Sequence, residues 1–429
     1  MPNITHHLPG LRLTDHFFNI PLDHAAPDGE RLQIYAREVV APDKAAEPLP
    51  WLVFLQGGPG FSAPRPPAMS SWLPRALRDY RVLLLDQRGT GRSSPVTFQT
   101  LARFPSPRAQ ADYLKHFRAD AIVQDAEWIR RALLGPDERW TVLGQSYGGF
   151  CIAHYLSAAP EGLATALFTG GLPPLARSAD EIYRATYRRV ITKNQRYYDR
   201  YPEDAAQARR IVDALRQQPA RLPGGGLLTP RRFQALGMAF GDSEGFELVH
   251  YALEEAFVAG SRGPELSYGF LRAVDAAHKF ETNPIYVLLQ EACYTQGAAS
   301  RWSAERVRAE YPEFDLAPER PVFFTGEMVY PWMFDDYADL RPLKAAAELL
   351  AEFDGWPRLY DPAVLRANRV PCAAALYYDD MYVERAFSEE MAQTIGGLKV
   401  WVTNEYEHNG LRADGERVLG RLLAMIKGT

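Results

Sequence analysis

The sequence predicts an α/β fold in which a mostly parallel sheet, flanked by helices, is interrupted by a large helical insertion. Short apolar runs rich in β-forming residues, such as residues 51–55 and 82–85, are typical of strands that helices cover on both faces. These runs alternate with helix-like segments, which implies parallel strands joined by right-handed crossovers. The alternation stops near residue 176 and returns after residue 356, so an insertion separates two parts of one sheet domain.

The first part contains the expected strands and helices in alternation. In chain order we expect two strands joined by a turn, two apolar strands, a helix, a strand–turn–helix unit and a further strand, at residues 11–40, 51–55, 82–85, 120–134, 140–156 and 164–168. The helix at 120–134 carries apolar residues at helical spacing and ends at Gly135-Pro136, a strong stop signal.

The insertion is mostly helical and rich in Arg, Tyr and Glu. We expect its helices at residues 179–200, 205–217, 231–240, 246–258 and 264–278, and a flexible connector at the glycines 224–226. Sheet-like sequence returns at 372–377 and 398–402, and a helix at 411–426 closes the chain. We therefore expect a core domain at 1–175 and 357–429 and a helical cap (lid) domain at 176–356.

Composition excludes several classes of function. The 429 residues are 47% hydrophobic and 24% charged, with a net charge of −5 and dispersed basic residues, which argues against a nucleic-acid surface. The three cysteines are too few and too scattered for a disulfide framework or a thiolate metal site. No apolar stretch is long enough to span a membrane, and the first residues lack the features of a secretory signal. We expect a cytoplasmic protein without a membrane partner.

The pentapeptide Gly144 to Gly148 is the most informative motif. It reads Gly-Gln-Ser-Tyr-Gly and lies between an apolar strand and a helix-like run. A sharp strand-to-helix turn of this form lifts the serine Oγ above the sheet, and its glycines avoid crowding of the backbone. The context predicts that Ser146 is the nucleophile of a hydrolase.

The acid and the base of a catalytic triad follow in the order that such folds use. Asp379 and Asp380 come after the strand at 372–377, and His408 comes after the strand at 398–402. The interval between Asp380 and His408 has room for one helix and one strand, as the geometry requires. We favour Asp380 as the acid that orients the imidazole. Asp379 would then point to solvent or cap the next helix.

Two loops are candidates for binding the oxyanion of a tetrahedral intermediate, which needs two N–H donors. One donor is the backbone N–H of Tyr147, directly after the serine. The other is expected in the glycine-rich loop at 56–60, after the strand at 51–55. Asp86 and Arg88 follow the next strand, and we expect them to brace the loops of the site.

Taken together, these motifs resemble the proline iminopeptidase (prolyl aminopeptidase) family of the α/β-hydrolase superfamily. The resemblance extends from about residue 12 to the C-terminus and rests on six stretches, at residues 56–60 (Q-G-G-P-G, similar to the family's H-G-G-P-G), 86–93 (D-Q-R-G-T-G-R-S), 144–149 (G-Q-S-Y-G-G), 326–332, 379–383 and 407–410. Gln56 replaces the family's histidine, which removes a side chain from the loop but keeps its backbone donors.

The resemblance implies a serine exopeptidase that releases an N-terminal residue, preferably proline, through an acyl-enzyme. Ser146 would be the nucleophile, with Asp380 and His408 as its partners. The N–H groups of Gly58 and Tyr147 would bind the oxyanion. The implied partners are short peptides with a free N-terminal proline.

An exopeptidase must also hold a free α-ammonium group, and burying this charge without a partner is costly. We therefore expect carboxylates to project from the cap. Glu291 and Glu327 lie in apolar stretches and are the candidates, whereas the glutamates at 247, 254 and 255 lie on an amphipathic helix and should be solvated. The cap also supplies aromatic residues that suit a pocket for a pyrrolidine ring, namely Tyr286, Tyr294, Trp302, Tyr330, Trp332 and Phe334.

Two alternatives stay open at this point. An esterase or lactonase could use the same triad with a cap that binds an acyl chain, in which case the pocket should be an apolar funnel. A catalytically silent binding module on this fold is disfavoured by the intact serine, aspartate and histidine. Epoxide hydrolases and haloalkane dehalogenases place an aspartate where Ser146 stands. No metal-binding cluster or dinucleotide motif occurs in the sequence, so we expect a hydrolase without a cofactor.

Overall fold

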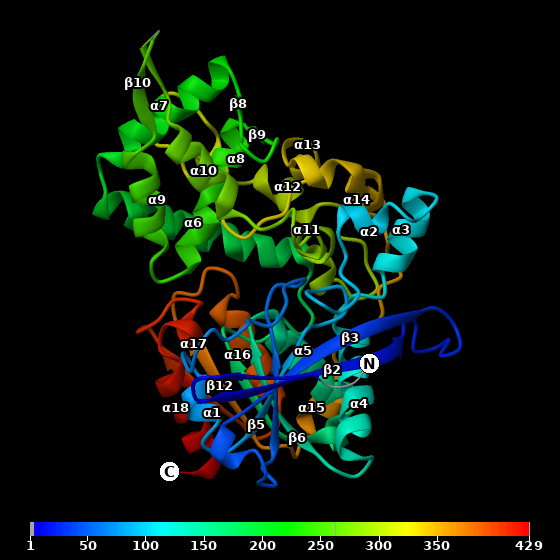
Figure 1. Cartoon of the computed structure of the whole chain (residues 1–429). Coiled ribbons are helices and arrows are strands. Elements are labelled where there is room, and N and C mark those ends of the chain that lie inside the picture. The colour runs from blue at the N-terminus through cyan, green and yellow to red at the C-terminus, as the bar shows by residue number, and fades with distance from the viewer. Residues whose placement is uncertain (1–3, 262, 429) are drawn as a thin grey trace.

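The computed structural model describes residues 4–261 and 263–428. Within them, the main sheet has nine strands in the order β1-β2-β3-β5-β4-β6-β7-β12-β13 (Figure 1). Neighbours from β5 to β13 in this order pair in parallel, whereas β1, β2 and β3 add antiparallel strands at one edge. The strands are Ile4–Leu8 (β1), Leu11–Pro21 (β2), Arg31–Val40 (β3), Trp51–Leu55 (β4), Arg81–Leu85 (β5), Trp140–Gln145 (β6), Leu163–Thr169 (β7), Cys372–Tyr377 (β12) and Leu398–Thr403 (β13).

Helices cover both faces of this sheet. Successive side chains of a strand point to opposite faces, so in β4 Val53 belongs to the core cluster that contains Ile152 of α5, and Phe54 belongs to the cluster that contains Leu422 of α18. The helices around the sheet are Leu73–Ala76 (α1), Ala119–Leu134 (α4), Tyr147–Ala158 (α5), Pro362–Arg366 (α15), Arg385–Thr394 (α16), Gly410–Ala413 (α17) and Gly415–Lys427 (α18). Burial on both faces explains the continuous apolar character of the strands.

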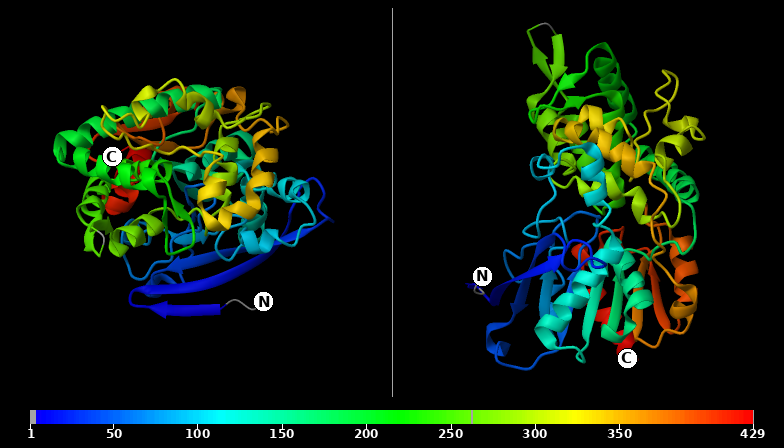
Figure 2. Two further views of the ribbon diagram at one scale, coloured as in Figure 1. Left: turned by 90° about the horizontal axis from the view of Figure 1, so that it is seen from above. Right: turned by 90° about the vertical axis from the view of Figure 1, so that its right-hand side faces the viewer.

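A mostly helical layer, which we call the cap, lies over one end of the sheet (Figures 1 and 2). Its main elements are Ala179–Arg200 (α6), Asp204–Gln217 (α7), Pro230–Gln234 (α8), the 3₁₀ helix Ala235–Gly241 (η3), Gly245–Glu254 (α9), Tyr268–Ala277 (α10), Ile285–Leu289 (α11), Ser303–Arg308 (α12), Met333–Asp336 (α13), the 3₁₀ helix Ala338–Leu343 (η6) and Lys344–Ala351 (α14). Two short helices from the first part of the chain, Phe98–Leu101 (α2) and Pro107–Leu114 (α3), contact η6 and α14. None of the helices formed by the described residues is both long and apolar enough to span a bilayer.

Outside the cap the predicted strands and helices are present in the predicted order, except that the helix predicted at 411–426 is divided into α17 and α18. Both α6 and β12 begin and end at the predicted residues. The cap contains corrections. The helices predicted at 246–258 and 264–278 are too long, because Phe257–Gly260 (β10) and Gly263–Leu266 (β11) pair as an antiparallel hairpin. Phe and Val favour extended backbone, and a strand pair needs no helical periodicity. The hairpin projects from the cap at its far end from the sheet (Figure 2).

The glycines at 224–226 form a defined turn instead of a flexible connector. They join two short antiparallel strands, Ala220–Arg221 (β8) and Leu227–Leu228 (β9). Gly225 has a φ of 89°, which side chains rarely allow, and its N–H donates to the carbonyl oxygen of Leu222 at 2.9 Å. The predicted helix at 231–240 is also interrupted, since α8 gives way to the 3₁₀ helix η3.

The contact between α5 and β4 generates a prediction about stability. A Cβ on Gly148 in α5 would lie 1.9 Å from the carbonyl oxygen of Leu55, so strand and helix would have to separate. We expect Gly148→Ala to lower the free energy of unfolding by at least about 3 kcal/mol, measured by urea denaturation. Gly420→Ala in α18 is the matched control, because the nearest atoms to its Cβ lie 3.9 Å away on Arg75. That variant should be neutral or gain up to about 1 kcal/mol. Equal effects of both variants would contradict the packing argument.

Candidate active site

Ser146 occupies the turn between β6 and α5 with a backbone conformation that few residues other than glycine adopt. Its φ is 56° and its ψ is −122°. Hydrogen bonds on both sides hold this conformation, because the Ser146 N–H donates to Thr169 O at 2.9 Å and the Gly149 N–H donates to Ser146 O at 2.7 Å. Strain of this kind persists only where the surrounding structure enforces it. The serine lines a cavity of about 570 Å³ between the core and the cap.

His408 and Asp380 form a buried pair. The His408 Nδ1 atom lies 2.7 Å from Asp380 Oδ2, and the carboxylate is 1% exposed. The other oxygen, Oδ1, accepts the N–H groups of Tyr382 at 2.9 Å and Val383 at 3.0 Å, which fixes the carboxylate in position. Burial by itself lowers the pKa of His408, but the negative charge of Asp380 and its hydrogen bond outweigh burial and raise it above its ordinary value.

The histidine lines the same cavity as the serine, and Gln145 connects the two loops. The Gln145 Nε2 atom donates to the backbone oxygen of His408 at 3.0 Å. Its Oε1 atom accepts from the hydroxyl of Thr169 at 2.7 Å. The residue before the serine therefore orients the loop that carries the histidine. Sequence analysis did not single out Gln145, because that position of the motif accepts any residue.

Asp379 is partly exposed, and it does not cap the next helix. Its carboxylate pairs with Arg196 at 2.9 Å and lies 3.7 Å from Arg189, and both arginines belong to α6 of the cap. The residue that caps α16 is Glu384, whose carboxylate accepts the N–H of Ala386. The two neighbouring aspartates thus face opposite ways, one toward His408 and one toward the cap.

The glycine-rich loop after β4 approaches Ser146 closely. A Cβ on Gly57 would lie 2.8 Å from the Cβ of Ser146, and Gly57 and Gly58 both line the cavity. Gly58 has a φ of 136°, which requires glycine. Tyr147 is the first residue of α5, so its N–H group lies at the positive end of that helix. The loop and the helix start are thus in place for the two predicted oxyanion donors.

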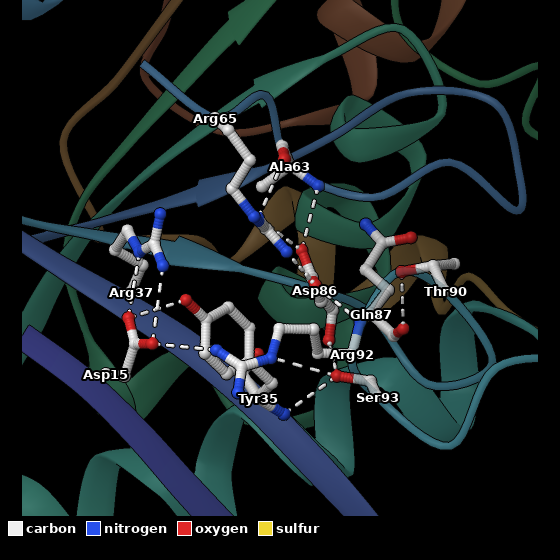
Figure 3. Close-up of polar contacts among 10 residues, drawn as sticks. All are labelled: Asp15, Tyr35, Arg37, Ala63, Arg65, Asp86, Gln87, Thr90, Arg92 and Ser93. Atoms are coloured by element: carbon white, nitrogen blue, oxygen red, sulfur yellow. Dashed lines mark hydrogen bonds and ion pairs between the residues drawn. The ribbon is translucent and has the colours of Figure 1, made fainter. Parts of the chain in front are cut away.

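Asp86, directly after β5, binds the segment that follows the glycine-rich loop, at Ala63 and Arg65 (Figure 3). It is fully buried, and its carboxylate accepts the N–H of Ala63 at 3.2 Å and the N–H of Arg92 at 2.9 Å. The guanidinium of Arg65 binds both carboxylate oxygens, with 2.9 Å between Nη1 and Oδ1. Arg88, which we expected to act with Asp86, instead binds Asp125 with 2.7 Å between Nε and Oδ2.

Gln87 and Asp15 also help to hold the loops around the site. Gln87 Nε2 donates to the backbone oxygen of Gln56 at 3.0 Å, directly before the two loop glycines. In β2, the carboxylate of Asp15 accepts hydrogen bonds from Tyr35, Arg37 and Arg92 (Figure 3). Burial raises the pKa of Asp15, but these hydrogen bonds outweigh burial and lower it to about 2. Strands β2 and β3 are therefore linked to the loop after β5, which contains Arg92, by hydrogen bonds of charged side chains.

The two candidate glutamates of the cap have different positions. Both carboxylate oxygens of Glu291 accept backbone N–H groups, from Ser303 at 3.0 Å and Ala304 at 2.9 Å, so Glu291 holds the start of α12. It does not line the cavity of Ser146. Glu327 does line this cavity and accepts the hydroxyl of Tyr286 at 2.7 Å. The structure thus brings Glu327 to the site and does not bring Glu291.

The environment of Glu327 changes its acidity. Burial raises the pKa of Glu327 to about 7, although the Tyr286 hydroxyl and the nearby His408 both favour the charged form. A carboxyl group that titrates near neutrality inside a cavity is a mark of a functional site. The other three glutamates considered in the cap do not line the cavity. Glu254 and Glu255 are exposed, as expected, and Glu247 pairs with Arg200 at 2.6 Å.

Aromatic side chains form the apolar wall of the cavity. Of the six predicted in the cap, Tyr286 lines the cavity, while the other five do not. Phe280, which sequence analysis missed, stacks on Tyr286 with 5.2 Å between ring centroids, and Phe61 lies edge-on to it at 5.7 Å. Tyr382 lies edge-on to the ring of His408 at 4.7 Å. The cavity therefore combines flat apolar surfaces with two carboxylates, Glu327 and Asp242, of which Asp242 pairs with Arg412 at 3.1 Å.

The opposite orientations of the two aspartates generate a prediction. Asp380→Asn should lower kcat by about three to four orders of magnitude, because the imidazole loses the partner that fixes its tautomer and stabilises its charged form. Asp379→Asn removes ion pairs with the cap and should change kcat less than about threefold. Steady-state rates of the two purified variants, together with thermal melting to verify folding, provide the measurement. A larger loss in the Asp379 variant would reverse the assignment.

The chain is similar to known proteins over most of its length. Residues 50–215 match the family model described as alpha/beta hydrolase fold. A proline iminopeptidase of Aeromonas sobria is 49% identical over 419 residues, which cover 97% of each chain. The proline iminopeptidase aneH of Aspergillus aculeatus is 35% identical and covers 98% of this chain and 95% of its own. Among solved structures, a proline iminopeptidase-related protein of Thermus thermophilus is 15% identical, with a TM-score of 0.40 and coverage of 96% of this chain and 97% of its own. The chain belongs to the proline iminopeptidase family of the α/β hydrolases.

Proposed function

We propose that this protein is a serine aminopeptidase that releases N-terminal proline from short peptides. One observation carries the proposal: a single cavity is lined by Ser146, by Glu327 and by His408, whose imidazole is paired with the buried Asp380. The serine and the histidine provide acyl transfer, and the carboxyl group provides a partner for a substrate amine. An esterase that binds an acyl chain has no use for the third group.

The reaction follows from the roles of the three side chains. His408 accepts the proton of Ser146 Oγ as the oxygen attacks the carbonyl carbon of the N-terminal proline. The N–H groups of Gly58 and Tyr147 bind the resulting oxyanion. His408 then donates the proton to the departing peptide nitrogen, which leaves a prolyl ester on the serine. Water, deprotonated by the same histidine, hydrolyses this ester and restores the enzyme. Asp380 orients the imidazole throughout.

Glu327 explains why a free N-terminus would be required. A secondary ammonium group enters a cavity with apolar walls, and it needs an anionic partner there. Glu327 is anionic above its pKa of about 7, and a bound cation would stabilise the anionic form further. The ring of Tyr286, which donates to this carboxylate, offers a flat surface to the pyrrolidine. Since the cap supplies both residues, we propose 176–356 as a cap domain and 1–175 with 357–429 as the catalytic domain.

The cysteines bear on where the protein works. Cys151, Cys293 and Cys372 are all free and buried. Thiols in this state suit the reducing cytoplasm, which we propose as the compartment.

The function is tested by the hydrolysis of three substrates. We expect strong turnover of proline β-naphthylamide, no turnover of its N-acetylated form, and weak turnover of a short-chain p-nitrophenyl ester. Ser146→Ala should abolish all turnover and leave the circular dichroism spectrum unchanged. Cleavage of the ester with no preference for the free amine would move the function to an esterase with the same triad. Activity of the Ser146 variant at the wild-type level would contradict the triad itself.

The pH dependence tests the role of Glu327. Because the pKa of this carboxyl is raised to about 7, it is neutral below that pH and charged above it. The ratio of kcat/KM for proline β-naphthylamide to kcat/KM for the ester should therefore rise between pH 5.5 and 7.5. In Glu327→Gln the ratio should fall at least tenfold at pH 7.5 and lose this pH dependence, since a buried charge loses its partner (~1.5–3 kcal/mol).

Glu291→Gln is the matched control, because it also neutralises a buried carboxyl of the cap. It weakens the hydrogen bonds that hold the start of α12, so it should lower the melting temperature and leave the substrate ratio unchanged. Equal losses on amide and ester substrates in Glu327→Gln would mean that Glu327 is structural.

A further inference from the structure

The cavity of Ser146 has charges of opposite sign at its inner and outer parts. Glu327 lies at the inner part, where its carboxylate meets the buried Tyr286. The exposed lining residues mark the rim, and they come from the core loop around Pro67, the cap segment 277–279 and Arg412. The rim is predominantly basic, and its basic side chains are Arg65, Lys279 and Arg412.

Two of these three cations already have partners. Arg65 binds the buried carboxylate of Asp86, and Arg412 lies 3.1 Å from Asp242. The ammonium group of Lys279 forms no ion pair or hydrogen bond with any described residue. It is thus the cation of the rim that is available to a ligand.

The backbone of Lys279 is nevertheless fixed. Its carbonyl oxygen accepts the backbone N–H of Asn283 at 3.0 Å and the side-chain amide of Asn283 at 2.9 Å. The next residue, Phe280, is buried and stacks on Tyr286, whose hydroxyl binds Glu327. A short series of contacts therefore connects the backbone of Lys279 at the rim to the carboxylate inside the cavity.

We propose that Lys279 binds the C-terminal carboxylate of short peptide substrates. This inference rests on the proposed function, in which Glu327 holds the N-terminal amine. A dipeptide or tripeptide is a zwitterion whose two charges are at most about 7–11 Å apart, and the cavity has the size of a small-ligand site. The protein would thus prefer short peptides with a free carboxylate, and would act late in peptide breakdown on the products of endopeptidases and dipeptide-releasing enzymes.

The test compares prolylglycine with prolylglycinamide, which lacks the negative charge but has the same scissile bond. In the wild-type protein, kcat/KM should be about two- to fivefold higher for the acid, as expected for a solvent-exposed ion pair. Lys279→Met should bring the ratio of acid to amide close to one, whereas Lys279→Arg should preserve it. Added salt should lower the ratio in the wild-type protein.

Lys427→Met, at the exposed end of α18, is the matched control for the loss of one positive charge, and its ratio should equal that of the wild-type protein. Equal rates on acid and amide in the wild-type protein, or an unchanged ratio in Lys279→Met, would overturn the role of Lys279. Proline β-naphthylamide has no carboxylate and reports on the proposed function separately. If it is cleaved while acid and amide react equally, only the inference about Lys279 fails; if it is not cleaved, the proposed function fails as well.

Discussion

The close contact between the start of α5 and strand β4 is the constraint on which the site depends. At Gly148 the helix lies so near to Leu55 that only hydrogen fits on the Cα, and at Gly57 the following loop reaches the side chain of Ser146. The nucleophile and the loop glycines are thus held together by backbone packing. This explains why the unfavourable φ of Ser146 is retained: relaxing it would separate the helix from the sheet. The free energy that stabilises the core also maintains the geometry of the nucleophile.

The cap participates in this geometry because it contacts the loop of the base directly. The N–H of His408 donates to the backbone oxygen of Gly241 in η3 at 3.0 Å, and the hydroxyl of Tyr382 donates to Met238 O. An ion pair between Lys193 of α6 and Glu407, at 2.5 Å, also links the cap to the loop that carries His408. His408 is therefore fixed from both sides, by Asp380 in the core and by backbone in the cap. The position of His408 therefore depends on the contact between the cap and the core.

The sequence predicted the site best where the type of a residue and its place after a strand point to one catalytic role. A serine between glycines, and an aspartate and a histidine after later strands, were enough to predict the Asp380–His408 contact. Long-range partners were not predictable, because nothing local in the sequence distinguishes Glu291, which binds backbone N–H groups of α12, from Glu327, which faces the cavity. Strand β1 was not predicted either, for a different reason. Its side chains are mostly exposed, and pairing with β2 gives them no apolar pattern.

The charges of the site also couple substrate binding to catalysis in the proposed function. Burial lowers the pKa of His408, but the charge and hydrogen bond of Asp380 and, after them, the negative charge of Glu327 raise it. The imidazole must be neutral to accept the proton of Ser146. A substrate ammonium bound at Glu327 cancels much of this contribution, so the pKa of His408 falls when the correct substrate is present. Asp380 remains to stabilise the imidazolium as the proton arrives. An N-acylated substrate brings no positive charge and leaves the histidine more readily protonated. The carboxyl group of Glu327 would therefore select for a free N-terminus twice, through binding and through the protonation state of the base.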